Sequence, residues 1–212
     1  RRVGLPLGYE SQQTAPEILL EERETAQTHL SLGLRAYPQI HPDREKLDLL
    51  TVVLGGGSSA RLSEELRERR GLAYDLSAYL WEDATETEVL LISMGVNNAR
   101  CEEALRVTLA ELARLREELI PEEELRKAKE MFRGERALDF ESSRAVCSYF
   151  LSQELQWGRV KTPEEKLKKI EAVTAEEVRE VAREIFVNEG LNLALIGPFS
   201  DPERFRSLLS LA

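Results

Sequence analysis

Three consecutive glycines, Gly55 to Gly57, are the feature that most constrains how this chain of 212 residues folds. Glycine adopts backbone angles that other residues avoid, so we expect a preceding helix to end here and the chain to turn sharply. Ser58 or Ser59 can then cap a new short helix. Leu62 and Leu66, four residues apart, give that helix one apolar face.

The short helix is expected to end at a further glycine. Three arginines fill its last turn, where the helix dipole favours cations: Arg67, Arg69 and Arg70. Gly71 is the expected residue just after the helix, and residues 72–81 are typical of a strand. This order places Arg67 before the turn and Tyr74 after it, so we expect both side chains to reach one patch of surface. Arg69 and Arg70 are interpreted as solvated charges.

The rest of the chain alternates between strand-like and helix-like patterns. Further strands are expected at 18–20, 27–34, 86–96 and 191–196, with the 72–81 and 86–96 pair joined by a turn at 82–85. Further helices are expected at 43–53, 97–119, 121–156 (interrupted at Gly134 and at 141–144) and 201–209, with Asp43 and an asparagine at 97 or 98 as caps. Capping boxes at Thr162 and Thr174 open two more short helices.

Strands at both ends of the chain with helices between them predict an α+β fold. We expect a single two-layer domain over residues 25–212, with a mostly antiparallel sheet and helices packed on one face. Residues 1–24 are interpreted as a linker that enters this domain. The chain begins at Arg1 without an initiator methionine, and we expect that it is cut from a longer protein.

Composition excludes several classes of partner. The formal net charge of −10 argues against nucleic acid, because binding phosphates requires a basic face. No run of about 18 uncharged apolar residues is present, which excludes a transmembrane helix. The two cysteines, Cys101 and Cys147, are interpreted as buried small hydrophobic residues that demand no oxidising compartment. The expected location is the cytoplasm, with the periplasm as the alternative.

The chain has no motif of a complete hydrolytic or nucleotide-binding centre. Its two histidines, His29 and His41, do not form the paired ligands that zinc hydrolysis requires, so we expect no metal site. The glycines lack the Lys-Ser/Thr of a phosphate-binding loop. A nucleophilic serine in Gly-x-Ser-x-Gly is also missing.

The segment around the short helix carries a family resemblance. Arg67-Glu-Arg-Arg-Gly-Leu-Ala-Tyr74, preceded by Leu54-Gly-Gly-Gly-Ser-Ser-Ala-Arg-Leu62, resembles the second half of the insulinase/pitrilysin family of zinc peptidases, which includes the processing peptidases. The similarity extends from about Thr25 to Phe199. Proteins of this family contain two copies of one α+β domain. The first copy binds zinc through His-x-x-Glu-His, and the second carries an Arg and a Tyr seven positions apart.

The resemblance implies that Arg67 holds the substrate backbone and Tyr74 the oxyanion, opposite zinc on another domain or chain. It implies that this chain is the substrate-binding half of a zinc metalloendopeptidase and is inactive alone. Two alternatives stay open: a separate subunit of a heterodimeric peptidase, and a non-catalytic scaffold of the same fold. Expected partners are the zinc-bearing half, a peptide substrate and, through the surface exposed in an isolated half, a second copy of the chain.

Overall fold

A five-stranded sheet organises residues 12–81 and 88–211, which are the residues that the computed structural model describes. The strands lie in the order β1-β5-β2-β4-β3. Their bounds are β1 Glu17–Glu22, β2 Thr28–Ala36, β3 Ala73–Trp81, β4 Glu88–Val96 and β5 Asn192–Gly197. Only the β1–β5 pair among these strands is parallel, which confirms the mostly antiparallel sheet.

The short strand expected at 18–20 is β1, an edge strand that pairs with β5 along its whole length. The sheet therefore takes in residues of the segment interpreted as an entry linker. At the other edge, β3 pairs with β4 alone. The turn predicted between these two strands at 82–85 lies outside the described residues.

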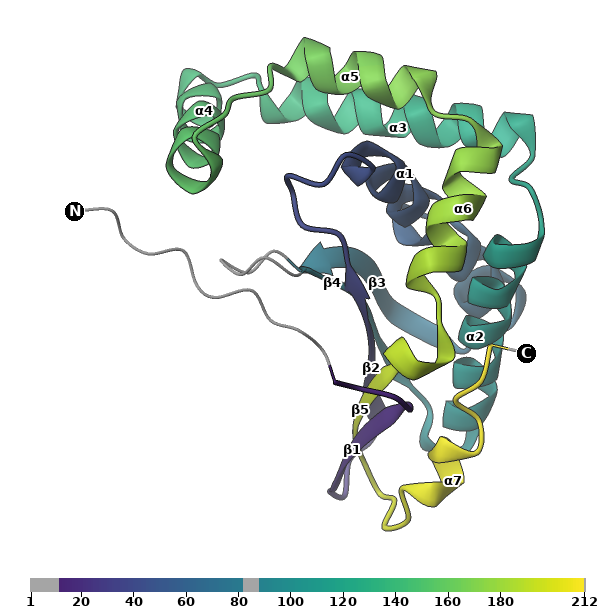
Figure 1. Cartoon of the computed structure of the whole chain (residues 1–212). Helices are drawn as coiled ribbons and strands as arrows, with labels where there is room; N and C mark the ends of the chain where they lie inside the picture. Colours follow the sequence, from purple (N-terminus) through teal and green to yellow (C-terminus); the bar gives the residue numbers. More distant parts are fainter. Residues whose placement is uncertain (1–11, 82–87, 212) are drawn as a thin grey trace.

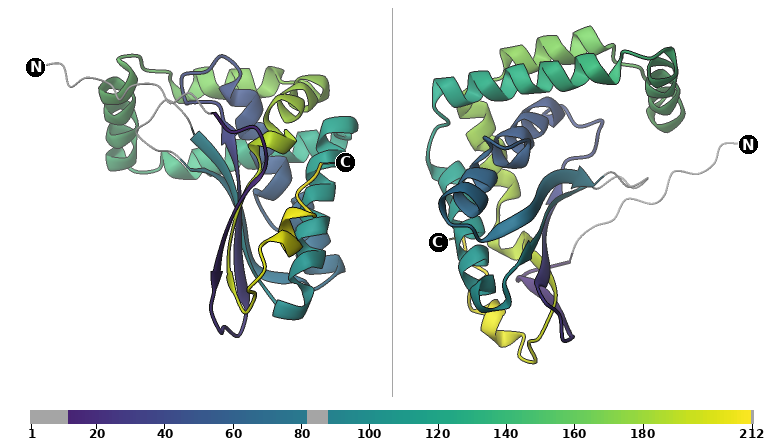
Figure 2. Two further views of the ribbon diagram at one scale, coloured as in Figure 1. Left: turned by 60° about the horizontal axis from the view of Figure 1, so that its bottom comes forward. Right: turned by 180° about the vertical axis from the view of Figure 1, so that it is seen from behind.

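The helices pack on one face of the sheet and leave the other open (Figures 1 and 2). The α-helices are α1 Arg44–Gly55, α2 Cys101–Glu117, α3 Glu122–Asp139, α4 Ser143–Trp157, α5 Pro163–Ala172, α6 Ala175–Ile185 and α7 Glu203–Arg206. Helices α3 and α5 run together across α1, and α4 extends beyond the edge of the layers (Figure 1). No helix in the described part of the chain has the length and apolar character needed to cross a membrane.

Local sequence signals account for most helix ends. Both capping boxes form: Thr162 caps α5 and Thr174 caps α6, each reciprocated by a glutamate three residues on. Ser142 caps α4 by accepting a hydrogen bond from the amide of Ala145 at 3.1 Å, so the break predicted at 141–144 is present. The interruption predicted at Gly134 is wrong, because α3 continues through it. The predicted terminal helix is shortened to α7.

Alternating leucines of β2 form the side of the hydrophobic core that the sheet contributes. Leu30, Leu32 and Leu34 of β2 are at most 1% exposed and face the helices. One side of α2 is buried as well, from Cys101 to Leu112. Burying each leucine side chain contributes roughly 1.5–3 kcal/mol, so these two elements hold the sheet and the helix layer together.

The glycine segment folds differently from the sequence expectation. Within the described residues, only Gly71 and Gly158 have positive φ, so Gly55 to Gly57 do not use the angles reserved for glycine. Space is the reason for glycine at position 55, because a Cβ there would lie 2.3 Å from the Cβ of Ala78. Glycine therefore allows the end of α1 to lie directly against β3.

Two predicted caps are also wrong. The carbonyl of Ala60 accepts the first helical hydrogen bond, from the amide of Glu64 at 2.9 Å, so Ser58 and Ser59 lie too early in the chain to cap this helix. Asp43 stands at the start of α1 but makes no cap, because its carboxylate pairs with Lys46 at 2.7 Å instead.

Candidate functional site

Arg67 lies on a short π-helix, Ser63–Arg69, which connects α1 to β3. The helix is anchored by Leu62 and Leu66, both fully buried, as their spacing predicted. A π-helix is rare and is frequently found at functional sites. After the π-helix, the amide of Leu72 donates a hydrogen bond to the carbonyl of Leu66 at 2.6 Å. This bond returns the chain toward the sheet beside Arg67.

Gly71 and a β-bulge then place Tyr74. Gly71 has φ +58°, the left-handed conformation expected just after the helix. In the β3–β4 register Ala73 faces Val96 and Asp75 faces Gly95, so Tyr74 is an extra residue without a cross-strand partner. A bulge of this kind redirects a side chain out of the regular alternation. The side chain of Tyr74 is 74% exposed.

The guanidinium of Arg67 donates a hydrogen bond to the backbone carbonyl of Tyr74. The two residues named from the sequence therefore lie together on one accessible patch, at the start of the edge strand. Neither is sealed in the core, since Arg67 is half-buried and Tyr74 is exposed.

The neighbouring arginines are held by carboxylates. Arg69 pairs with Glu64 at 2.5 Å and with Glu65 at 2.6 Å, and Arg70 pairs with Glu65 at 3.0 Å. Glu65 is 7% exposed and so fixes both arginines against the π-helix. Arg67 differs because it binds a backbone carbonyl, a group that an incoming peptide also presents. The arginines at 69 and 70 are exposed to solvent, as expected, and are also paired with carboxylates.

Arg67 and Tyr74 can donate hydrogen bonds to oxygen atoms, but neither side chain is a general base that could activate water. A guanidinium has five N–H donors and a permanent charge, and a tyrosine hydroxyl donates one hydrogen bond. Both groups suit a peptide carbonyl or the negative oxygen of a tetrahedral intermediate.

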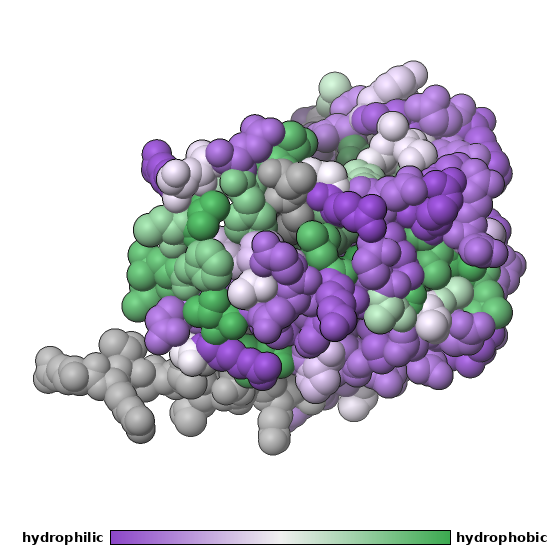
Figure 3. Space-filling view, turned by 90° about the horizontal axis from the view of Figure 1, so that it is seen from above, coloured by the Kyte–Doolittle hydropathy of each residue, from purple (hydrophilic) through white to green (hydrophobic). Residues whose placement is uncertain are grey.

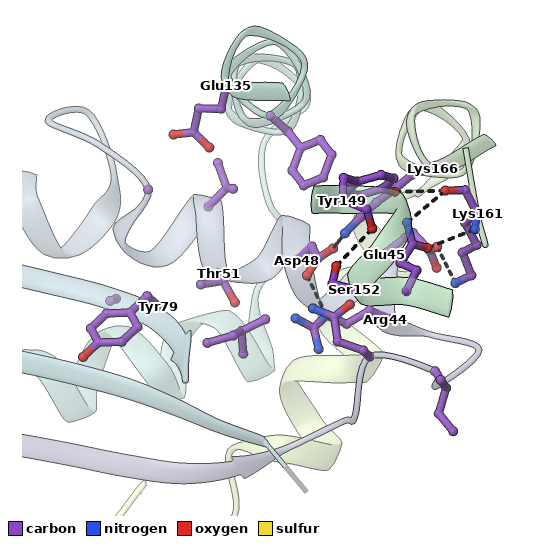
Figure 4. Close-up of a pocket in the computed structure, with 18 of the residues that line it drawn as sticks. Arg44, Glu45, Asp48, Thr51, Tyr79, Glu135, Tyr149, Ser152, Lys161 and Lys166 are labelled. Atoms are coloured by element: carbon purple, nitrogen blue, oxygen red, sulfur yellow. Dashed lines mark hydrogen bonds and ion pairs between the residues drawn. The ribbon is translucent and has the colours of Figure 1, made fainter. Parts of the chain in front are cut away.

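A second feature, not anticipated from the sequence, is a cavity of about 760 Å³ between β3, α1, α3 and α4. Figure 4 shows Tyr79 and Glu135 at one end and a group of charged side chains at the other. Within the group, Asp48 binds Arg44 and Lys166, each at 2.7 Å. The ion pair between Lys161 and Glu45, at 2.9 Å, joins the α4–α5 linker to α1.

These charges are paired with one another and join distant parts of the fold. Burial would raise the pKa of the Asp48 carboxyl, but Lys166 and Arg44 outweigh burial and hold the pKa below its usual value. Arg44 also pairs with Glu88 of β4. The only sequence signal for this cluster was the i,i+4 spacing of Arg44 and Asp48; its other members come from distant segments.

The histidines do not form a metal site. His41 stacks on the ring of Tyr37 with centroids 3.9 Å apart, and its Nδ1 accepts a hydrogen bond from the amide of Asp43. His29 is exposed on β2, a separate element. Over residues 12–81 and 88–211, no three His, Cys, Asp or Glu side chains are grouped so that they could hold a metal ion. The two histidines therefore do not fit a zinc ion.

Sequence comparison identifies relatives among zinc proteases. Residues 4–132 match the family described as the peptidase M16 inactive domain. The chain is 35% identical over 196 residues to the uncharacterized zinc protease YmxG of Bacillus subtilis, covering 92% of this chain and 47% of that protein. It is 33% identical to the uncharacterized zinc protease Rv2782c of Mycobacterium tuberculosis, covering 92% and 45%. The chain thus spans about half the length of these curated relatives.

Structural comparison finds the same fold. A protease from Helicobacter pylori superposes with a TM-score of 0.83 at 21% identity, over 93% of this chain and 48% of that one. A peptidase M16 inactive domain from Pseudomonas fluorescens gives 0.81 at 20% identity, over 91% and 46%. Both neighbours support the α+β fold with its mostly antiparallel sheet.

Proposed function

Because this chain belongs to the peptidase M16 inactive-domain family, we propose that it is the substrate-binding half of a zinc metalloendopeptidase. In this proposal the zinc is bound by a second half, in the same polypeptide or in a partner subunit. Two observations support a zinc site outside this chain. Relatives named zinc proteases are about twice as long as this chain, and the described residues present no cluster able to hold a metal.

The single observation that carries the proposal is the hydrogen bond from the Arg67 guanidinium to the backbone carbonyl of Tyr74, whose side chain is 74% exposed. Arg67 would hold a carbonyl of the peptide backbone. The carbonyl of Tyr74 occupies its guanidinium when no peptide is present, so binding would exchange one carbonyl for another. Such an exchange keeps the guanidinium hydrogen-bonded throughout.

Tyr74 would donate a hydrogen bond to the oxyanion that develops on the scissile carbonyl. The bulge leaves its side chain without a cross-strand neighbour, so the hydroxyl is available to a partner that approaches the β3 edge. When bound by the other half, zinc supplies the Lewis acid for peptide hydrolysis.

The test is Tyr74→Phe in the complete protein, with the zinc-bearing half present. Loss of one oxyanion donor is expected to lower kcat by about 10²–10³-fold, with a much smaller change in KM. Steady-state cleavage of a peptide substrate measures both constants.

Tyr79→Phe is the matched control, because Tyr79 lies on the same strand, is 40% exposed and loses the same hydroxyl. Its kcat is expected to stay at the wild-type value. An unchanged kcat in Tyr74→Phe would remove the oxyanion role.

A further inference from the structure

Helix α4 is unusually poor in charge for the surface of this protein. Of its fifteen residues, Ser143–Trp157, only Arg144 and Glu154 are charged. In the neighbouring helix α5, by contrast, six of ten residues are charged. A helix that is apolar on more than one face is normally buried on more than one face. Helix α4 therefore needs a contact in addition to the one it makes with the rest of this chain.

Two side chains on the inner face of α4 are hydrogen-bonded to the segment that follows the helix. The hydroxyl of Tyr149 donates to the carbonyl of Lys161 at 3.1 Å. Gln153, 6% exposed, accepts a hydrogen bond from the amide of Lys161 at 2.9 Å. These bonds hold α4 to the linker that follows it and leave its outer face toward solvent.

The outer face carries an apolar stripe at helical spacing. We define the outer stripe as Cys147, Leu151 and Leu155, which follow one another at intervals of four residues and so share one side of the helix. Cys147 is exposed, and Leu151 and Leu155 are 55% and 75% exposed. Leu138 at the end of α3 adds a side chain that is 67% exposed.

The position of α4 sets it apart from the helix layer. Figures 1 and 2 show it beyond the layer, on the side toward which the open face of the sheet looks. Figure 3 shows hydrophobic side chains gathered at this end of the molecule. A protein domain that packs against this end of the molecule would contact the outer stripe.

Strand β3 connects this end to the Arg67–Tyr74 patch. Tyr79 and Leu80 of β3 line the same cavity as Tyr149 and Ser152 of α4. Tyr79 lies five positions after Tyr74, a distance of about 17 Å along a strand. A domain of about 200 residues has a radius of gyration near 16 Å. A domain placed against Tyr74 is therefore wide enough to reach α4.

We propose that the outer stripe of α4 is a docking surface for the zinc-bearing half of the peptidase. The inference rests on the proposed function, which already requires a second body beside Tyr74. The occupant follows from the relatives: YmxG is 35% identical across 92% of this chain, which is only 47% of its own length. The remaining half is a partner of suitable size.

The experiment measures the affinity between this chain and the zinc-bearing half, produced as two polypeptides, by sedimentation velocity. The double variant Leu151→Glu, Leu155→Glu is expected to weaken association at least about 100-fold, because two leucine side chains lose their buried apolar environment. Leu119→Glu is the matched control. Leu119 is 43% exposed just after α2, and its substitution is expected to change affinity by no more than about twofold.

Hydrogen exchange of the wild-type chain gives a second measurement that needs no variant. Amides of α4 are expected to exchange more slowly when the zinc-bearing half is added. Unchanged exchange in α4, or wild-type affinity in the double variant, would overturn the proposal. So would a double variant that loses only self-association, because the occupant would then be a second copy of the chain.

The two proposals can fail separately. Tyr74→Phe is expected to lower kcat without changing association, whereas the stripe variant changes association first. Normal kcat in Tyr74→Phe with weakened binding in the stripe variant would remove the oxyanion role and leave the docking surface. The reverse pair of results would remove the docking surface alone.

Discussion

At the residue scale, Gly55 sets the distance between a helix and a strand. A Cβ at this position would meet the Cβ of Ala78 at 2.3 Å, well inside contact distance. Ala78 is 7% exposed and belongs to β3, whose neighbours hold it in the sheet. Neither partner has a flexible side chain that could move aside, so α1 or β3 would have to shift.

Gly55→Ala is therefore expected to lower the free energy of unfolding by about 1–3 kcal/mol, the usual cost of overpacking. Gly134→Ala is the matched control, because Gly134 lies inside α3 and nothing approaches its added methyl within 4 Å. That variant is expected to gain about 0.5–1 kcal/mol from helix propensity. Denaturant unfolding of both variants measures the difference. Equal effects would contradict the steric explanation.

At the element scale, α1 is held at its N-terminal end by charge and at its C-terminal end by close packing. Arg44 and Asp48, 3% and 9% exposed, connect the helix to β4 through Glu88 and to α5 through Lys166. Burying such charges is costly unless each keeps its partner. Removing one of these charged groups is therefore expected to lower the free energy of unfolding by more than the ion pairs themselves contribute, because its partners stay buried and unpaired.

Asp48→Asn is expected to destabilise the chain by about 3–5 kcal/mol at neutral pH, because Arg44 and Lys166 lose their shared carboxylate. The folded-state pKa of Asp48 is lowered. Its contribution is therefore complete above the unfolded pKa of about 3.9 and is lost as the pH falls through the lower folded value. Stability measured between pH 7 and pH 2 should fall less steeply in the variant.

Asp75→Asn is the control for this prediction, since Asp75 is exposed on β3. Its free energy of unfolding is expected to stay within about 0.5 kcal/mol of wild type. A pH profile of Asp48→Asn identical to that of the wild type would exclude the carboxylate cluster as the source of acid sensitivity.

At the scale of the whole molecule, the two thiols differ in solvent exposure: one lies in the core and the other on the surface. Cys101 of α2 is 1% exposed, and burial raises the pKa of its thiol to about 11. The expectation that Cys147 is buried is wrong, because its side chain is exposed on α4, within the outer stripe. One cysteine thus reports on the packed layers and the other on the proposed docking surface.

Labelling of the native chain with a thiol reagent near pH 7 is expected to modify Cys147 rapidly. Cys101 should react more than about 100-fold more slowly, because a raised pKa reduces its thiolate fraction and burial blocks access. Unfolding exposes both thiols, and Cys147→Ser removes the fast phase. Addition of the zinc-bearing half should protect Cys147. Rapid labelling of Cys101 in the folded chain would contradict the assigned core.

The sequence by itself determined the features that depend on a few neighbouring residues. The two capping boxes, the left-handed Gly71 and the alternating leucines of β2 follow from local backbone and side-chain chemistry. The placement of Arg67 and Tyr74 on one patch also follows from local chemistry, because a single turn separates them. Their catalytic roles stay a prediction until kinetics test them.

Only the tertiary structure decided what depends on contacts between distant segments. Gly55 is required by its contact with Ala78, not by its backbone angles, and the Asp48 cluster combines α1 with α5 and β4. The uncovered stripe of α4 belongs to this class as well, since its spacing alone would equally suit a buried core. Neighbouring residues in the sequence determine where the chain turns. The steric and electrostatic contacts of a residue such as Gly55 or Asp48 form with segments far away in the sequence, so they exist only once the chain has folded.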